Sequence, residues 1–288
     1  MTRLREEDVA RIPGQLSAYD ARLKRTTGAS LRQIACWGAG VEEDLIVDVL
    51  DRVRFAAVPV GSGLGVIGGF SGAVAAIVSH LGFEGFVTER GDMAGIAEGI
   101  ERGGDVLMLA DDHRFVAIVP GREHVVDNDQ ATARGFVAGL ELMKGGLAGE
   151  SALVLGCGPV GVAAAKVLLD RGAEIALADV DQDRALAALR DMGKDASDRI
   201  RLEDPAPDTL EGYGLIFEAT NSGNFIEAAN LTPNTLVAAP GMPCALTTEA
   251  LAKHRDRILH DALEIGTATM AVQAAATLAG EAVKKGGR

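Results

Sequence analysis

The spacing G-x-G-x-x-G occurs twice in this chain, as GLGVIG at residues 63–68 and as GCGPVG at residues 156–161. Each copy follows a short apolar run, FAAVPV at residues 55–60 or SALVL at residues 151–155, and precedes a helical stretch. A strand that ends in a glycine turn and opens a helix starts a βαβ unit, and in dinucleotide-binding proteins this turn cradles the pyrophosphate. The two copies therefore predict an α/β protein with at least one cofactor loop.

Short apolar runs continue to alternate with helical stretches after each glycine turn. They predict buried strands at GFVTE, DVLMLAD and FVAIVP in the first half, and at EIALADVD, YGLIFEAT and TLVAAPG in the second. The expected architecture is two doubly wound, Rossmann-like α/β units in series, with helices at both ends of the chain and a cleft between the units. Such clefts are common ligand sites.

The best linker candidate is KGGLAGE, residues 144–150. We expect residues 1–144 to form an N-terminal helical segment with an α/β substrate-binding domain. Residues 145–288 are expected to form a Rossmann NAD-binding domain that ends in an Ala-rich helix. Two helices are predicted within residues 3–35, with a break at Pro13-Gly14.

The composition of the chain limits the kinds of molecule that it can bind and the setting in which it works. The 288 residues carry a formal net charge of -13, which argues against nucleic acid because phosphate binding needs clustered Lys and Arg. The three cysteines lie far apart, so neither a metal site nor a disulfide framework is expected. The amino terminus does not resemble a signal peptide, and the Gly-rich stretch 65–83 indicates a buried helix rather than a membrane span. A cytoplasmic protein is the simplest interpretation.

The second glycine turn is the better cofactor loop. It lies directly at the end of its strand and is followed by small residues that allow tight helix packing. Asp179, which ends the next apolar run, is placed to accept the adenosine ribose hydroxyls and to repel a 2′-phosphate, which favours NAD over NADP. The predicted loop residues are Gly156, Cys157, Gly158, Pro159, Val160 and Gly161.

The first turn is weaker, because Pro59 before it cannot donate to a strand ladder and its glycines continue to Gly72. Taken alone it is open to three interpretations, which are a second nucleotide site, a plain turn, or backbone that lines the substrate cleft.

Six segments together resemble one family. VPVGSGLGVIGGFS, DVLMLADDHRF, GCGPVG, FEAT, APGMPCALT and EIGTATM occur in this order. The ordered set is similar to the NAD-dependent dehydrogenases of pyrrolysine biosynthesis, the PylD family, from the amino-terminal helices to about Met270.

The resemblance implies oxidation of the terminal amine carbon of 3-methyl-D-ornithyl-N6-L-lysine, the last step towards pyrrolysine. Oxidation yields an imine that water converts to an aldehyde and ammonia, and the ornithine α-amine then closes a five-membered ring, which intramolecular geometry makes easy. The protein has to orient the carbon and keep the amine neutral while the cofactor takes the hydride.

The resemblance also implies substrate residues. Asp111 is the first choice for holding an amine or relaying its proton and Asp112 the second, because both follow a strand end; a cap or surface turn is the alternative for each. The first glycine turn becomes part of the substrate seat, through Ser62 and Gly63. Leu4 matches a residue that closes over the substrate, with ordinary helix packing as the alternative. Asp261 stands where the family has a Glu; because Asp is shorter, a contact through a water and loss of the role are both open, and Glu264 is a competitor.

The resemblance and the Rossmann pattern indicate a nicotinamide pocket. Asn128 and Thr132, on a helix expected from Asp127 to Lys144 before the linker, are candidates for hydrogen bonds to substrate or nicotinamide. The pocket residues are Ala219, Thr220, Pro240, Gly241, Gly266 and Thr267.

Two other functions remain open on the sequence. One is a different two-domain NAD-dependent dehydrogenase of amino or hydroxy acids, and the other is a non-catalytic NAD-binding sensor. The Ala-rich carboxyl-terminal helix also makes a homodimer an expectation to test.

Overall fold

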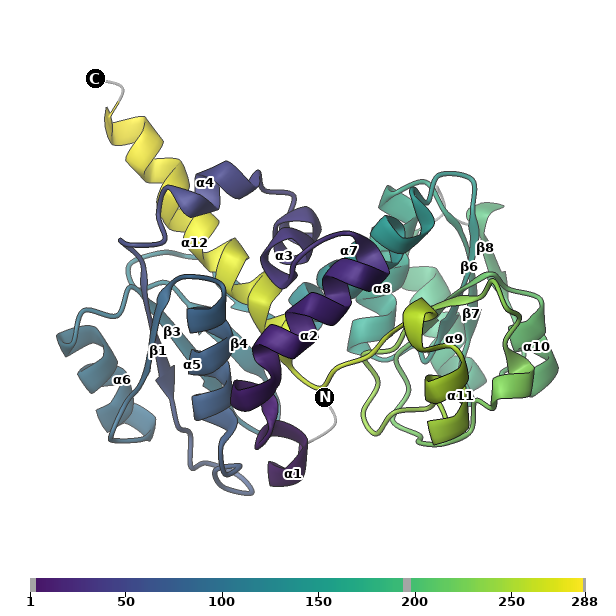
Figure 1. Ribbon diagram of the computed structural model, residues 1–288, viewed down its shortest axis with the longest axis horizontal. Coiled ribbons are helices and arrows are strands. Elements are labelled where there is room, and N and C mark those ends of the chain that lie inside the picture. The colour runs from purple at the N-terminus through teal and green to yellow at the C-terminus, as the bar shows by residue number, and fades with distance from the viewer. Residues whose placement is uncertain (1–3, 194–197, 287–288) are drawn as a thin grey trace.

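The computed structural model describes residues 4–193 and 198–286, and Figure 1 shows two sheets side by side with helices α2 and α7 between them. The first sheet has the order β2-β1-β3-β4-β5 and the second β11-β10-β9-β6-β7-β8. The α/β class expected from the sequence is confirmed. Each sheet is built from one of the two alternating stretches that begin with a glycine turn.

The first sheet comes from the chain before residue 128. Its strands are β1 Arg54–Val58, β2 Glu84–Val87, β3 Val106–Ala110, β4 Phe115–Ile118 and β5 Val125–Asp127. Its helices are α1 Glu6–Val9, α2 Ile12–Thr27, α3 Leu31–Ala39, α4 Glu43–Val47, α5 Phe70–His80 and α6 Asp92–Glu101.

Strands β1, β2 and β3 are parallel, whereas β4 runs antiparallel to both of its neighbours, β3 and β5. A parallel neighbour needs a crossover of a dozen or more residues. Only residues 111–114 join β3 to β4, so these strands form a hairpin. The run FVAIVP therefore is a strand, as expected, but one that reverses direction.

The second sheet is parallel throughout. Numbered in chain order from β6, its strands follow the order 3-2-1-4-5-6 of dinucleotide-binding folds. The strands are β6 Ser151–Leu155, β7 Glu174–Ala178, β8 Ile200–Leu202, β9 Leu215–Glu218, β10 Leu236–Ala238 and β11 Ile258–Leu259. The helices are α8 Pro159–Asp170, α9 Gln182–Asp191, α10 Pro207–Glu211 and α11 Thr248–Lys253.

The break predicted at Pro13-Gly14 is wrong. Helix α2 begins at Ile12 and runs through both residues to Thr27. Proline is tolerated in the first turn of a helix, where its missing N–H would have no partner. The helix ends instead at Gly28, whose φ of 78° is left-handed and therefore suits glycine.

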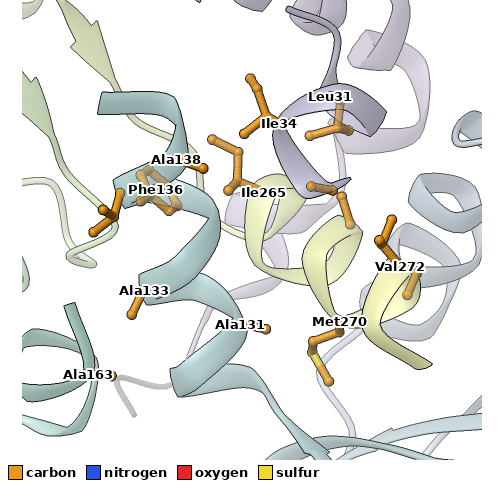
Figure 2. Packing of buried hydrophobic residues seen from close by; sticks show 14 of the residues in the cluster. Leu31, Ile34, Ala131, Ala133, Phe136, Ala138, Ala163, Ile265, Met270 and Val272 are labelled. Carbon is orange, nitrogen blue, oxygen red and sulfur yellow. The ribbon is translucent and has the colours of Figure 1, made fainter. Parts of the chain in front are cut away.

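Helices α7 (Asn128–Lys144) and α12 (Glu264–Gly286) form the centre of the molecule together with α3. Figure 2 shows Ile34 of α3, Ala138 of α7 and Ile265 of α12 close together in one buried cluster. The helices approach closely, because a β-carbon at Gly135 of α7 would clash with the side chain of Thr269 on α12.

The carboxyl-terminal helix therefore packs differently from what chain order predicts. It contacts α3, α7, α5, β4 and β5, on the side of the first sheet, although it follows the second sheet in the chain. Figure 1 shows it crossing above the first sheet. A domain boundary at residues 144–145 stays a prediction. In the structure α12, which lies at the carboxyl-terminal end of the chain, packs against helices and strands from residues 1–144.

Among the helices that the structure describes, none has both the length and the apolar character needed to cross a membrane. The Gly-rich stretch near residue 70 is instead α5, eleven residues long by its bounds Phe70–His80, packed on the first sheet. Over the described ranges, no group of three or more His, Cys, Asp or Glu side chains is arranged to hold a metal ion.

Candidate functional site

A cavity of about 1070 Å³ lies at the carboxyl ends of the strands of the second sheet, facing α7 and the start of α12. Ligands of parallel α/β sheets bind at this edge, and the reversal of strand order between β6 and β9 is its usual centre. The first half of the chain contributes Leu4, Phe70 and Phe115.

Most of the predicted site residues line the wall of this cavity. From the expected cofactor set it contains Gly156, Cys157, Gly158, Pro159, Val160, Asp179, Ala219, Thr220, Pro240, Gly241 and Gly266. From the expected substrate set it contains Leu4, Asn128, Thr132 and Asp261. The residues outside the wall are Ser62, Gly63, Asp111, Asp112, Gly161 and Thr267.

The glycine turn after β6 is shaped by close backbone contacts. Gly156 has a φ of 88°, and a β-carbon there would lie 2.7 Å from the carbonyl oxygen of Ala219. A β-carbon at Gly161 would clash with the carbonyl oxygen of Gly156. Gly158 caps α8 and has open space before it, so the first backbone amides of a twelve-residue helix face the cavity without a side chain in the way. This arrangement fits the pyrophosphate of a dinucleotide.

Asp179 lies directly after β7, beside this turn. Its Oδ2 accepts a hydrogen bond from the Cys157 amide at 2.7 Å, and its Oδ1 accepts one from the Asp181 amide at 2.9 Å. The carboxylate is thereby held at the cavity wall next to the exposed side chain of Val180. The position fits an acceptor for ribose hydroxyls.

At the other end of the cavity, two acids lie at the start of α12. Asp261 lines the wall and is 8% exposed, and Glu264 is 9% exposed. Burial, followed by the neighbouring charge of Asp261, raises the pKa of Glu264 to about 8. Burial also raises the pKa of Asp261, although a hydrogen bond from Tyr19 opposes this rise. A buried acid pair of this kind can hold a cation or a proton.

The first turn of α7 adds a third carboxylate. Asp129 lines the wall, and its Oδ1 is buried and has no hydrogen-bond partner among the residues that the structure describes. Burial raises the pKa of Asp129, and the charge of Asp127 adds to this rise. Nearby, the Thr132 hydroxyl donates to Asn128 Oδ1 at 3.3 Å.

Gly266 and Thr267 differ in their placement. Gly266 lines the wall where α12 meets α7, and a β-carbon there would clash with the Thr132 hydroxyl. Thr267, one residue further, is fully buried away from the wall. Within the described ranges its hydroxyl oxygen has no hydrogen-bond partner.

Asp111 and Asp112 lie in the hairpin turn between β3 and β4. Asp111 Oδ1 accepts from the amides of His113 and Arg114 at 2.8 Å each, and these bonds lower its pKa. Asp112 Oδ2 accepts from the Leu64 amide at 2.6 Å. The first glycine turn is thus tied to Asp112, and a β-carbon at Gly63 would clash with that carboxylate.

Both aspartates line a second, smaller cavity of about 60 Å³. Leu4 and Phe70 belong to the walls of both cavities, so the two spaces adjoin. Ser62 lies beside this region without lining either wall.

Sequence reasoning missed Tyr19, Asp129 and Glu218. Glu218 ends β9, is fully buried, and accepts from the amide and hydroxyl of Thr220 at 2.7 and 2.6 Å. Burial raises its pKa to about 7 despite these bonds. An acid that ends an apolar run, as in FEAT, is the signal that could have found it. No local pattern connects Tyr19 to the site.

The parallel sheet in the order 3-2-1-4-5-6, the glycine turn after its first strand and the acid after its second define a Rossmann-type α/β protein. Residues 8–126 match the family model described as "Pyrrolysine biosynthesis protein PylD, N-terminal domain". The chain is 30% identical to the pyrrolysine synthase of Methanosarcina barkeri, over 94% of this chain and 97% of that protein. It is 28% identical to that of Methanosarcina acetivorans, over 94% and 98%. The chain belongs to the PylD family.

Solved structures support the fold. The quinate dehydrogenase of Corynebacterium glutamicum, solved in complex with NAD, superposes with a TM-score of 0.52 at 16% identity, over 82% of this chain and 99% of that one. The shikimate dehydrogenase of Aquifex aeolicus gives a TM-score of 0.50 at 13% identity, over 81% and 97%. At such low identity the likeness shows the architecture alone.

Proposed function

We propose that this protein is an NAD-dependent amine dehydrogenase that completes pyrrolysine biosynthesis. It oxidises the terminal amine carbon of 3-methyl-D-ornithyl-N6-L-lysine, and ammonia loss and ring closure then give pyrrolysine. Family membership supports this assignment. The observation that carries it is one cavity with a dinucleotide-type glycine turn at one end and buried carboxylates at the other.

The chain's own residues fit the cofactor. The amides at the start of α8 would hold the pyrophosphate, and Asp179 would accept hydrogen bonds from the adenosine ribose hydroxyls, a preference for NAD over NADP. Thr220, Gly241 and Gly266, which line the cavity wall, would hold the nicotinamide end. NAD, when bound, supplies the hydride acceptor.

The acids at α12 and α7 match a cationic diamine. A primary amine is protonated at neutral pH and has to lose a proton before its carbon can give up a hydride. Asp261 holds the ammonium group, and the pair with Glu264 accepts its proton. Closing the cavity around the substrate favours the intramolecular attack that forms the ring.

The second cavity seats the remainder of the substrate in this proposal. Asp111 holds a further amine, with Asp112 behind it, and Ser62 and Gly63 shape the adjoining turn. Leu4 covers the junction of the two cavities, where it lies in both walls. Asn128 and Thr132 contribute hydrogen bonds from α7, and Pro240, Ala219 and Thr267 support the nicotinamide pocket.

Mass spectrometry after incubating the full chain with NAD and the methylornithyl-lysine substrate tests the assignment. We expect pyrrolysine and one equivalent of ammonia. Reduction of NAD with simple amino or hydroxy acids, and none with this substrate, would replace the assignment by a different dehydrogenase. NAD binding by a folded protein without any turnover would favour a sensor instead.

Two smaller points belong to the same proposal. A homodimer formed through the Ala-rich end of the chain is tested by sedimentation velocity across a concentration series, in which a monomer at every concentration would contradict it. The division into a substrate-binding part, residues 1–144, and a cofactor-binding part, residues 145–288, is tested by limited proteolysis near residues 144–150 with and without NAD.

A further inference from the structure

Tyr19 of α2 connects the amino-terminal helices to the acid pair of the cavity. Its hydroxyl donates to Asp261 Oδ2 at 2.5 Å, across 242 residues of chain. Both side chains are 8% exposed. In a low-dielectric setting a charged acceptor binds its donor more tightly than a neutral one does.

The two carboxylate oxygens of Asp261 accept hydrogen bonds from different donors. Oδ1 accepts from the Ile265 amide at 3.3 Å, in the first turn of α12, whereas Oδ2 depends on Tyr19. Glu264 Oε2 accepts from the Leu263 amide at 3.1 Å, whereas the Tyr19 phenol donates to Asp261. The carboxyl groups of Asp261 and Glu264 therefore differ in their hydrogen-bond donors.

Few other charges face this group. Arg22, one turn beyond Tyr19 on α2, places its guanidinium carbon 5.1 Å from the Tyr19 ring centroid and donates to the His260 carbonyl at 3.3 Å. His260 precedes Asp261 and makes a hydrogen bond through Nδ1 with the Ala239 carbonyl at 2.8 Å. The charged and titratable groups that act on the cluster are thus Arg22, His260 and the two acids themselves.

We infer that Tyr19 is a positioning residue that keeps Asp261 ionised at the cavity wall and leaves the single proton of the acid pair on Glu264. A phenol can donate one hydrogen bond, and a carboxylate accepts it better than a neutral acid does. Two carboxylates this close cannot both stay ionised in a buried site, so the one without the donor takes the proton.

The titration behaviour agrees with this geometry. Burial and the charge of Asp261 raise the pKa of Glu264 to about 8, so it is protonated at neutral pH. Burial and then Asp261 raise the pKa of Tyr19 well above its usual value, so the phenol remains a donor throughout. The inference rests on the proposed function only in naming a substrate ammonium as the partner of Asp261.

Infrared difference spectroscopy of the full chain without substrate tests where the proton lies. The protonated carboxyl stretching band at pH 7 should weaken in Glu264→Gln, which leaves the contribution of Glu218, and should regain intensity when Tyr19→Phe is added to Glu264→Gln. In Tyr19→Phe alone, the midpoint for loss of the band should move up by about one pH unit. Thermal melting confirms that each variant is folded.

Tyr213→Phe is the matched control. Tyr213 is the second of the two tyrosines in the chain, and it also donates to a carboxylate, Glu203 Oε1, at 2.9 Å, but outside the cavity wall. Its loss should leave the band unchanged. An unshifted midpoint in Tyr19→Phe, or an equal shift in both variants, would overturn the inference.

Turnover separates this inference from the proposed function. The pH profile of kcat/KM should shift in Tyr19→Phe by the same amount as the infrared midpoint, and adding Asp261→Asn should abolish the effect of Tyr19→Phe. If the infrared shifts appear and no substrate is oxidised, the proton placement stands and the assigned reaction fails. If turnover occurs and the band does not respond to Tyr19→Phe, the assigned reaction stands and the proton placement fails.

Discussion

The carboxylate of Asp179 accepts a hydrogen bond from the backbone amide of Cys157, with 2.7 Å between Oδ2 and the nitrogen. This bond joins the end of β7 to the glycine turn after β6, so the anion and the turn are placed as one unit. A carboxylate oxygen has two lone pairs, so the bond leaves capacity for a ribose hydroxyl. Asp179 therefore has a structural partner as well as a proposed ligand.

Asp179→Ser should change cofactor preference. Removing the carboxylate removes an acceptor for the ribose hydroxyls and the repulsion of a 2′-phosphate. We expect NADH affinity to fall about tenfold, equal to about 1.4 kcal/mol, while NADPH affinity rises. Fluorescence titration with both cofactors measures the ratio. Asp181→Asn, two residues further and outside the cavity wall, is the control, and an unaltered ratio in Asp179→Ser would contradict the assigned role.

Two glycines of the same turn should respond differently to alanine. A β-carbon at Gly161 would clash with the Gly156 carbonyl oxygen, so Gly161→Ala should lower the free energy of unfolding by about 1–3 kcal/mol and weaken NADH binding. Gly158 has no atom near its β-carbon position, so Gly158→Ala should keep its stability and lose only cofactor affinity. Denaturant unfolding and NADH titration separate the effects, and equal unfolding curves for the two variants would refute the packing argument.

Glu218 should make stability depend on pH. Because burial raises its folded pKa to about 7, the folded state keeps a proton that the unfolded state releases above pH of about 4.3. The free energy of unfolding of the wild type should therefore fall as the pH rises from about 4.3 to about 7. Glu218→Gln lacks this titration, so above pH 7 it should be more stable than the wild type by roughly 3 kcal/mol. Thermal melts from pH 2 to 8 measure the difference.

Glu98 supplies a control of opposite sign for that experiment. Backbone hydrogen bonds from the Glu89 and Arg90 amides lower its pKa to about 2. Its contribution is therefore present above pH of about 4.3 and is lost as the pH falls towards 2. Glu98→Gln should be destabilising at pH 7 and neutral near pH 2. If both glutamate variants show the same pH trend, the assigned causes are wrong.

Asp111→Asn tests the substrate role of the hairpin turn. An amide oxygen can accept the bonds from the His113 and Arg114 amides, so the fold should persist, whereas the charge that would hold an amine is lost. We expect kcat/KM to fall at least about tenfold. Asp105→Asn, at the opposite end of β3 where the side chain accepts from the Arg54 amide, is the matched control. Equal activity in the two variants would remove Asp111 from the site.

Local patterns predicted the parts of the site that lie within one βαβ unit. The turn around Gly156, the strand that ends before Asp179 and the helix from Asn128 to Lys144 follow from apolar periodicity and glycine spacing. The short strands β8 and β11 gave no such signal, because three or two residues carry too little periodicity.

The sequence alone determined the α/β class, the positions of the two glycine turns and the family resemblance, since each depends on residues close together in the chain. Tertiary structure decided the reversal of β4, the packing of α12 beside the first sheet and the bond between Tyr19 and Asp261. The reversal of β4 follows from its four-residue connection to β3, whereas the other two features arise when helices pack through small residues and bring distant segments together. That step depends on complementary shape and on burial of polar groups with partners, which no local spacing encodes.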